Sequence, residues 1–160
     1  MKYLVNVRLA LLIFITASLS FSGCTVHYVA DYDASIKEEI LQVAKNVDLF
    51  WGALIDSDTS KREYEKFKVQ YNQIETDIRG LVMINEIRDL NTESTKQANI
   101  ALDLWVKDRK FHKQNNTFSD FEAKRHRKQF TRIFTAMAKG EEAKNISATS
   151  GSGESKGDNK

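Results

Sequence analysis

Proline is absent from all 160 residues of the chain, and only seven glycines occur. Because proline removes a backbone donor and clashes with the preceding helical turn, its absence leaves long helical patterns uninterrupted. Apolar residues recur at alternating spacings of three and four, which is typical of helices that bury one face. The sequence therefore predicts an all-α fold.

Four helices are expected, over residues 34–54, from 61 to between 81 and 90, from about 92 to 113, and from about 120 to 139. Helices of similar length joined by short loops favour an antiparallel up-and-down bundle. In the third helix the apolar residues spread around more than half the circumference, so we expect it to be the most buried. The core-facing positions that the spacing predicts in the other three are Ile36, Ile40, Val43, Val47, Phe50 and Leu54; Tyr64, Phe67, Tyr71, Ile74, Ile78 and Leu81; and Ala123, His126, Phe130, Ile133, Phe134 and Met137.

Two capping boxes mark helix starts. Ser60 with Glu63, and Ser119 with Glu122, have the spacing in which a hydroxyl and a carboxylate satisfy each other's backbone amides. The fourth helix is expected to stop at Gly140. Residues 141–160 have the composition of a flexible tail that cannot bury enough apolar surface to fold. The bundle is thus predicted over residues 34–140.

The N-terminus has the three parts of a secretory signal peptide. A basic start with Lys2 and Arg8 precedes an apolar run over residues 9–21, and the small residue Gly23 precedes Cys24. The apolar run is too short for a comfortable membrane span. Cys24 is the only cysteine, and an unpaired thiol is unusual in an exported protein. Residues 1–23 are therefore interpreted as a signal peptide.

Ser22, Gly23 and Cys24 resemble the lipobox of bacterial lipoproteins, although Phe21 stands where leucine is usual. The resemblance implies cleavage between Gly23 and Cys24, a diacylglycerol thioether on the Cys24 sulfur, and an acyl group on its amine. Thr25, rather than aspartate, implies the outer membrane, with the body facing the periplasm. Residues 24–33 would then be a short lipidated tether. An ordinary cleaved leader or an uncleaved anchor are the alternatives.

The body is also similar to a group of small Gram-negative helical lipoproteins. The matching features are Tyr32-Asp33 before the first helix, residues 50–54 at its end, residues 64–71 in the second, His112 near the end of the third, and Glu141-Glu142-Ala143-Lys144. The resemblance implies a periplasm-facing bundle and no known activity.

Charge is distributed unevenly along the chain. Residues 31–105 hold 15 acids and 9 bases, whereas residues 106–139 hold 3 acids and 10 bases. On the fourth helix Lys124, Arg125, Lys128 and Arg132 lie away from the apolar stripe. These residues either contact anionic headgroups or an acidic partner, or form a solvated face beside acidic helices, which is the favoured interpretation. Nucleic acid is not an expected partner, because export separates the body from it.

Metal binding is not predicted. Asp108 and His112, and separately Glu122 and His126, are four residues apart, whereas di-metal bundles need a glutamate and a histidine three apart on two helices, with two further glutamates. His126 is instead expected to be a hydrogen-bonded core residue. His112, near a helix C-terminus, is expected where a cationic side chain is favoured.

The sequence also lacks a nucleophile elbow, a Gly-rich phosphate loop and a zinc-protease motif. We therefore predict no enzymatic activity, no cofactor and no small-molecule substrate. The predicted function is a lipid-anchored, periplasm-facing binding or structural module of the cell envelope, held to the membrane by lipid on Cys24. The alternative is an accessory or inhibitory subunit of an envelope protein complex, and a soluble secreted helical protein is the third hypothesis.

Overall fold

The structure, a computed structural model, describes residues 29–150. It contains α2 (Ala34–Asp56), the short 3₁₀ helix η2 (Thr59–Lys61), α3 (Tyr64–Glu86), α4 (Thr92–Asn115) and α5 (Asp120–Ser150). No strand occurs in this part of the chain. None of the helices in residues 29–150 is long and apolar enough to cross a bilayer. The predicted signal peptide, with Gly23 and Cys24, lies outside the described residues.

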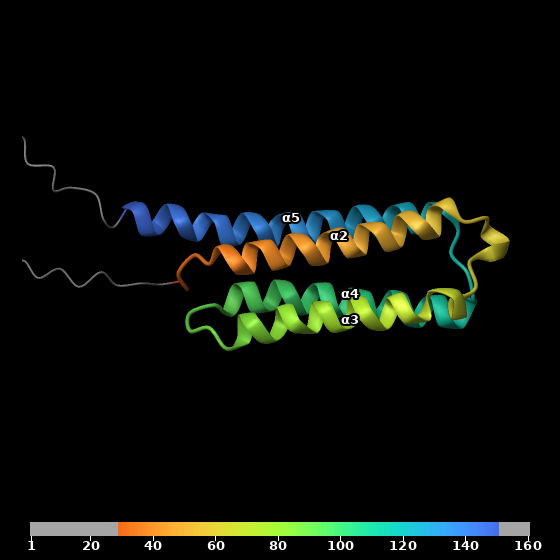
Figure 1. The fold of residues 1–160 in the computed structure, drawn as a ribbon, viewed down its shortest axis with the longest axis horizontal. Helices are drawn as coiled ribbons and strands as arrows, with labels where there is room; N and C mark the ends of the chain where they lie inside the picture. The colour runs from red at the N-terminus through yellow and green to blue at the C-terminus, as the bar shows by residue number, and fades with distance from the viewer. Residues whose placement is uncertain (1–28, 151–160) are drawn as a thin grey trace, which may run out of the picture.

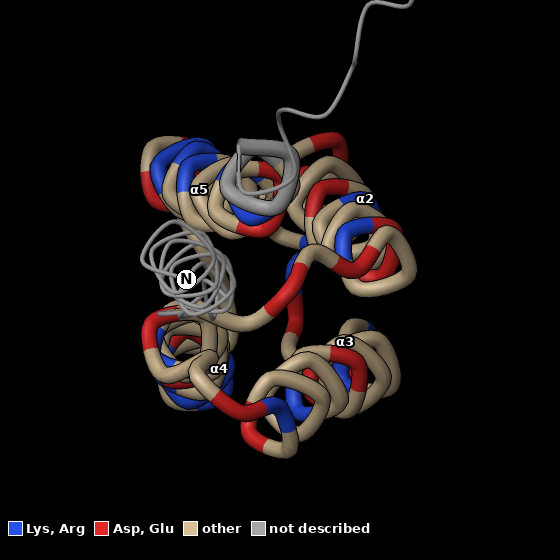
Figure 2. The backbone as a smooth tube through the Cα atoms, turned by 90° about the vertical axis from the view of Figure 1, so that its left-hand side faces the viewer, with Lys and Arg blue, Asp and Glu red and all other residues tan. Residues whose placement is uncertain are grey.

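The four long helices run up and down in two layers, α2 with α5 and α3 with α4 (Figure 1). Seen end-on they stand at the corners of a square, so that each helix packs on its two neighbours (Figure 2). Residues 29–33, the α3–α4 connection and the last turns of α5 share one end (Figure 1). The α2–α3 and α4–α5 connections share the other. The prediction of an all-α, up-and-down bundle is confirmed.

Aromatic rings fill the centre of the bundle. Trp51 and Trp105 are fully buried with ring centroids 6.4 Å apart, and Phe50 packs edge-on against Tyr71 at 4.5 Å. Phe130 of α5 closes the group at 5.6 Å from Trp105. Each buried aromatic contributes about 1.5–3 kcal/mol by leaving water. The apolar stripes predicted for α2 and α3 are buried throughout.

The expectation that the third helix would be the most buried is wrong. Ile100, Val106 and Phe111 of α4 are exposed. The face of α4 that meets its neighbours is narrow, because it consists largely of Ala98, Ala101, Leu102 and Trp105. An apolar residue outside that stripe therefore stays at the surface.

The start of α3 also differs from the prediction. The chain forms η2 at Ser60, and α3 begins four residues later at Tyr64. Glu63 makes no capping hydrogen bond and pairs with Lys66 at 2.5 Å. The Tyr64 backbone N–H donates instead to Asn116 Oδ1 at 2.9 Å, so a side chain from another connection replaces the local cap.

The second capping box is confirmed. The Glu122 N–H donates to Ser119 Oγ at 3.3 Å, and the Ser119 N–H donates to Glu122 Oε2 at 2.9 Å. Two backbone amides at the start of α5 are thereby satisfied by neighbouring side chains.

The predicted stop of the last helix at Gly140 is wrong. Helix α5 passes through Gly140 and continues to Ser150. Glu141 and Lys144, placed in the flexible tail by composition, are only 1% and 8% exposed. They are buried because each finds charged and polar partners on other elements, as described below. Residues 151–160 of the predicted tail lie outside the described residues.

Candidate interaction surface

Four basic side chains stand on the outer side of α5. Lys124, Lys128 and Arg132 follow one another at intervals of four and so share a helix face, with Arg125 beside them. All four are exposed, and none pairs with a carboxylate in residues 29–145. Blue segments mark Lys and Arg on the outer side of α5 in Figure 2. We call Lys124, Arg125, Lys128 and Arg132 the basic face.

Other basic residues form the expected ion pairs with the acidic helices. Arg127 makes a two-pronged ion pair with Asp48 of α2, with both N–O distances 2.6 Å. Arg109 of α4 donates to Glu75 of α3 at 2.8 Å. Ion pairs inside the bundle therefore account for Arg127 and Arg109, whereas the four exposed residues of the basic face make no ion pair in the described part of the chain.

An exposed aromatic extends the basic face. Phe121 is 73% exposed, and the guanidinium carbon of Arg125 lies 6.0 Å from the centre of its ring. A cation held over an aromatic ring combines positive charge with apolar surface. Phe121 was not predicted to be part of this surface, although its position off the apolar stripe of the helix marks it as exposed.

Neither of the carboxylate–histidine pairs that are four residues apart within one helix forms a contact. Glu122 caps α5, whereas His126 Nδ1 lies 2.8 Å from Asp108 Oδ2 of α4. Nδ1 makes no hydrogen bond in this contact, whereas His126 Nε2 accepts from Arg125 Nη2 at 3.3 Å. The His126 ring also stacks on Trp51, with centroids 5.4 Å apart. His126 is therefore a hydrogen-bonded residue at the edge of the core, as predicted.

Burial acts on the ionisation of the Asp108 carboxyl. Loss of water raises the pKa of the Asp108 carboxyl, and contact with His126 opposes the rise. In the described part of the chain, no group of three His, Cys, Asp or Glu side chains could hold a metal ion. The pair joins α4 to α5 inside the bundle, where a solute would have to open the core to reach it.

His112 lies in the last turn of α4, as expected, but its side chain is fully buried. Its Nε2–H donates to the Arg62 carbonyl at 2.6 Å, which leaves Nδ1 to accept from the Tyr71 hydroxyl at 3.1 Å. Both ring nitrogens of the neutral imidazole are thus satisfied. Burial lowers the pKa of His112, so the expectation of a cationic side chain is wrong.

We predict that mild acid destabilises the bundle through His112. Below about pH 6.5 the His112 imidazole binds a proton in the unfolded chain but stays neutral in the folded protein. The free energy of unfolding therefore decreases as the pH is lowered, by at most about 1.4 kcal/mol per pH unit. Urea unfolding between pH 7.5 and 5.5 measures the slope. His112→Gln should flatten it while lowering stability at pH 7.5. The raised pKa of Asp108 makes the folded protein more stable as the pH is lowered, so Asp108 cannot produce this loss of stability. If the loss of stability in acid were unchanged in His112→Gln, its assignment to His112 would be wrong.

A buried arginine organises the end of the bundle near the α2–α3 connection. Arg62 is almost fully enclosed although it lies in a connecting segment. It donates to the carbonyls of Ile55, Ser57 and Phe118 and to Asp120 Oδ1, at 2.6–3.0 Å. One side chain therefore ties the α2–α3 connection to the start of α5.

A second buried polar group closes the opposite end. Glu141 accepts from the Asp33 N–H at 3.0 Å, from Arg88 at 3.2 Å and from Lys144 at 2.5 Å. Lys144 also donates to Asn91 Oδ1 at 2.7 Å. We call Asp33, Arg88, Asn91, Glu141 and Lys144 the Glu141 cluster. It joins the start of α2, the α3–α4 connection and α5.

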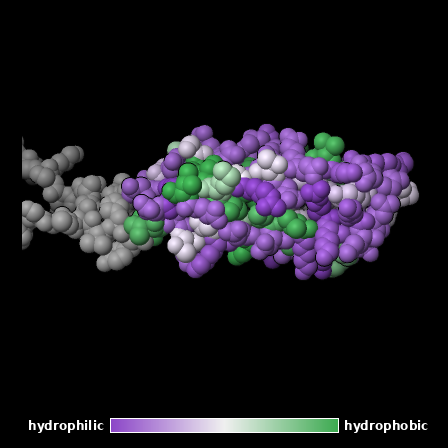
Figure 3. Space-filling view, turned by 90° about the horizontal axis from the view of Figure 1, so that it is seen from below, coloured by the Kyte–Doolittle hydropathy of each residue, from purple (hydrophilic) through white to green (hydrophobic). Residues whose placement is uncertain are grey.

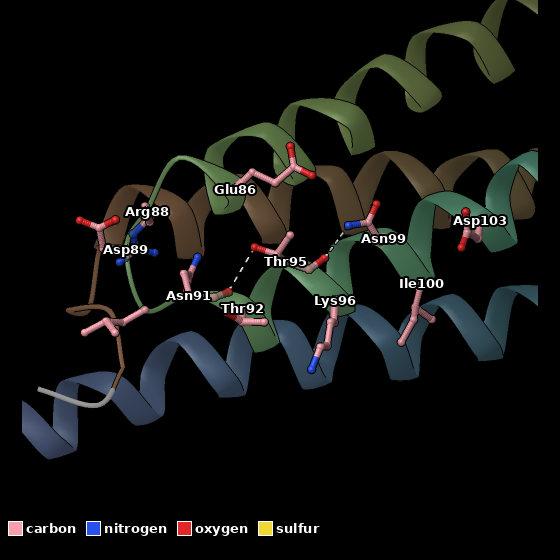
Figure 4. Close-up of a pocket in the computed structure, with 11 residues that line it drawn as sticks. Glu86, Arg88, Asp89, Asn91, Thr92, Thr95, Lys96, Asn99, Ile100 and Asp103 are labelled. Atoms are coloured by element: carbon pink, nitrogen blue, oxygen red, sulfur yellow. Dashed lines mark hydrogen bonds between the residues drawn. The ribbon is translucent and has the colours of Figure 1, made fainter.

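An open depression lies beside this cluster, between the end of α3 and the outer face of α4 (Figure 4). Its lining includes both acids and bases, such as Glu86, Lys96 and Asp103. Thr95 and Asn99 bond to carbonyls of the α4 backbone rather than pointing polar groups at a ligand (Figure 4). The depression is therefore a weaker candidate than the basic face.

Comparisons with protein families, with curated proteins and with solved structures found no match. The basic face is consequently assigned on its geometry and charge alone.

Proposed function

We propose that the chain is a lipid-anchored envelope protein whose helical bundle is a non-catalytic binding or structural module facing the periplasm. The observation that carries the proposal is the leader that ends in Ser22-Gly23-Cys24, with Cys24 the only cysteine. Two or more acyl chains attach a protein stably to a bilayer, whereas one binds only marginally. The bundle would then be retained at the membrane without a spanning helix.

The non-catalytic part of the proposal is supported by the position of the titratable groups. Asp108 and His112, the carboxyl and imidazole whose pKa burial shifts, both lie inside the bundle. Catalytic acids and bases must come within hydrogen-bond reach of a substrate. These two residues instead join helices to one another.

Mass spectrometry of the mature protein purified from envelopes tests the proposal. The expected N-terminus is Cys24, with a mass increase that matches a diacylglycerol group and one further acyl chain. A mature chain that begins at Met1, or one with an unmodified thiol at Cys24, would overturn it.

The basic face favours a second candidate function, an accessory or inhibitory subunit of an envelope complex. Its four charges make no ion pair among the described residues, and Phe121 adds exposed apolar surface. Capture of a stoichiometric protein from detergent-solubilised envelopes would support this candidate. Retention by lipid or peptidoglycan without a protein partner would support the first.

We predict that neutralising the basic face weakens binding to anionic vesicles. Each basic group near such a surface contributes about 1 kcal/mol, so each replacement by glutamine should weaken binding roughly fivefold. The assay uses mature protein with Cys24→Ser, so that lipid makes no contribution. The control variant replaces Lys61, Lys66, Lys68 and Lys96, four exposed lysines that already pair with acids, by glutamine. Equal losses in both variants would show that net charge, not the basic face, drives binding.

A further inference from the structure

We propose that an apolar edge at one end of the bundle, made of Val29, Ile87 and Leu90, lies against the bilayer surface. The proposal rests on lipid anchoring at Cys24 and specifies how the bundle sits on the membrane. These side chains are 47%, 82% and 56% exposed. They belong to the N-terminal segment and the α3–α4 connection, which share one end of the bundle (Figure 1). We call these three residues the apolar edge.

The N-terminal segment is held against the α3–α4 connection. The Ala30 N–H donates to the Leu90 carbonyl at 3.1 Å, and the Arg88 guanidinium donates to the Asp31 carbonyl. The Asp33 N–H donates to the buried Glu141 carboxylate at 3.0 Å. Because these bonds reach two different elements, the direction in which residues 29–33 leave the bundle is fixed.

The tether is too short to carry this end away from the membrane. Val29 is the fifth residue after Cys24, and five residues span at most about 17 Å when fully extended. With lipid on Cys24 in the bilayer, Val29 lies within that distance of the headgroups whatever the path between them. The opposite end of the bundle lies about 35 Å away along α3, at 1.5 Å per residue. The bilayer is therefore the nearest surface to the apolar edge.

Leu90 stands in a backbone conformation that does not suit leucine. Its φ is +58°, in the left-handed region that favours glycine or asparagine. The other described residue of this kind is Asn116, whose side chain caps α3. The Leu90 side chain can make no such bond, and it is largely exposed. Strained residues of this kind concentrate at binding sites, and contact with lipid would give the side chain an apolar surrounding.

The surface around the edge fits this orientation. The view from the α3–α4 side shows apolar patches that run from the end that carries the termini across the middle of this face (Figure 3). Helix α5 projects beyond the α3–α4 connection (Figure 1), so contact requires the bundle to tilt toward α3 and α4. The exposed acids Asp31, Glu86 and Asp89 lie nearby in the chain. We therefore expect zwitterionic headgroups at the edge rather than anionic ones.

Spin labels on the mature, lipidated protein in phosphatidylcholine vesicles test the proposal. One variant carries Ile87→Cys, and the matched control carries Val69→Cys, in the part of α3 nearest the opposite end. The native side chains are 82% and 75% exposed, so the bundle itself shields the two positions similarly. Acylation would leave Cys24 without a free thiol, which confines the label to the introduced cysteine. Collision rates with oxygen and with a water-soluble nickel complex are measured at each position.

The expected result is a loss of nickel collisions and a gain of oxygen collisions at position 87, with position 69 unchanged from water. Equal access of nickel to both labels would overturn the membrane contact. Shielding at 87 accompanied by dipolar broadening between labels would also overturn it, because a second copy would then cover the edge. A mass spectrum of the same sample separates the two proposals: unmodified Cys24 removes lipid anchoring and this inference together, whereas lipidated protein with an accessible position 87 removes only this inference.

Discussion

Glu141→Ala is expected to lower the free energy of unfolding by about 3–5 kcal/mol, because it removes one partner from a buried charged network. The carboxylate is 1% exposed and accepts from Arg88, from Lys144 and from the Asp33 N–H. Alanine would leave Lys144 at a site that is only 8% exposed, without the carboxylate to which it donates at 2.5 Å. Urea unfolding followed by circular dichroism measures the change.

Glu142→Ala is the matched control for this experiment. Glu142 is the next residue on α5, and its carboxylate pairs with Lys37 at the surface. Exposed ion pairs contribute little to stability, so this variant should unfold close to the wild type. If both alanine variants changed the free energy of unfolding equally little, the last turns of α5 would not pack on the bundle. The prediction from composition that this segment is a flexible tail would then be correct.

The spacing of the apolar residues predicted much of the fold, because it indicates which face of each helix is buried. The stripes of α2 and α3 are buried as expected, from Ile36 to Leu54 and from Tyr64 to Leu81. The same rule failed for α4, where Ile100 and Phe111 remain at the surface. The spacing of apolar residues identifies the apolar stripe of a helix. How much of that stripe is buried depends on how close the neighbouring helices come.

Buried charges were the main features that the sequence did not reveal. Arg62, Glu141 and Lys144 look like solvated residues in a connection or a polar tail, and composition treats them so. Their burial depends on carbonyls and side chains brought from distant parts of the chain, which no local pattern contains. The spacing of three between Glu141 and Lys144 was the only local sign that the two could pair on one helix face.

The candidate surface was easier to predict than the ends of the bundle. The basic face was identified from helical spacing alone, and all four of its residues are exposed. What the sequence could not decide was which bases pair inside the molecule. Only the structure separates Arg127, bound to Asp48, from its unpaired neighbour Lys128.

Cys24→Ser is expected to release the protein from the membrane fraction. Each buried methylene of an acyl chain contributes roughly 0.8 kcal/mol to membrane attachment, so removing every chain should change retention from nearly complete to nearly none. Fractionation of envelopes with and without the substitution measures this, and fatty-acid labelling should disappear in parallel. The control is Thr25→Ser, which alters the neighbouring residue without removing the sulfur.

The released variant should keep its fold, because Cys24 precedes every residue that contributes to the core. Equal urea midpoints for Cys24→Ser and Thr25→Ser would show that release does not follow from unfolding. A Cys24→Ser protein that stays on the membrane without fatty acid would contradict lipid anchoring, and attachment through the uncleaved leader or through a partner would then have to replace it. The variant therefore tests the anchor separately from the bundle, whose helices pack through a core that begins at Ile36.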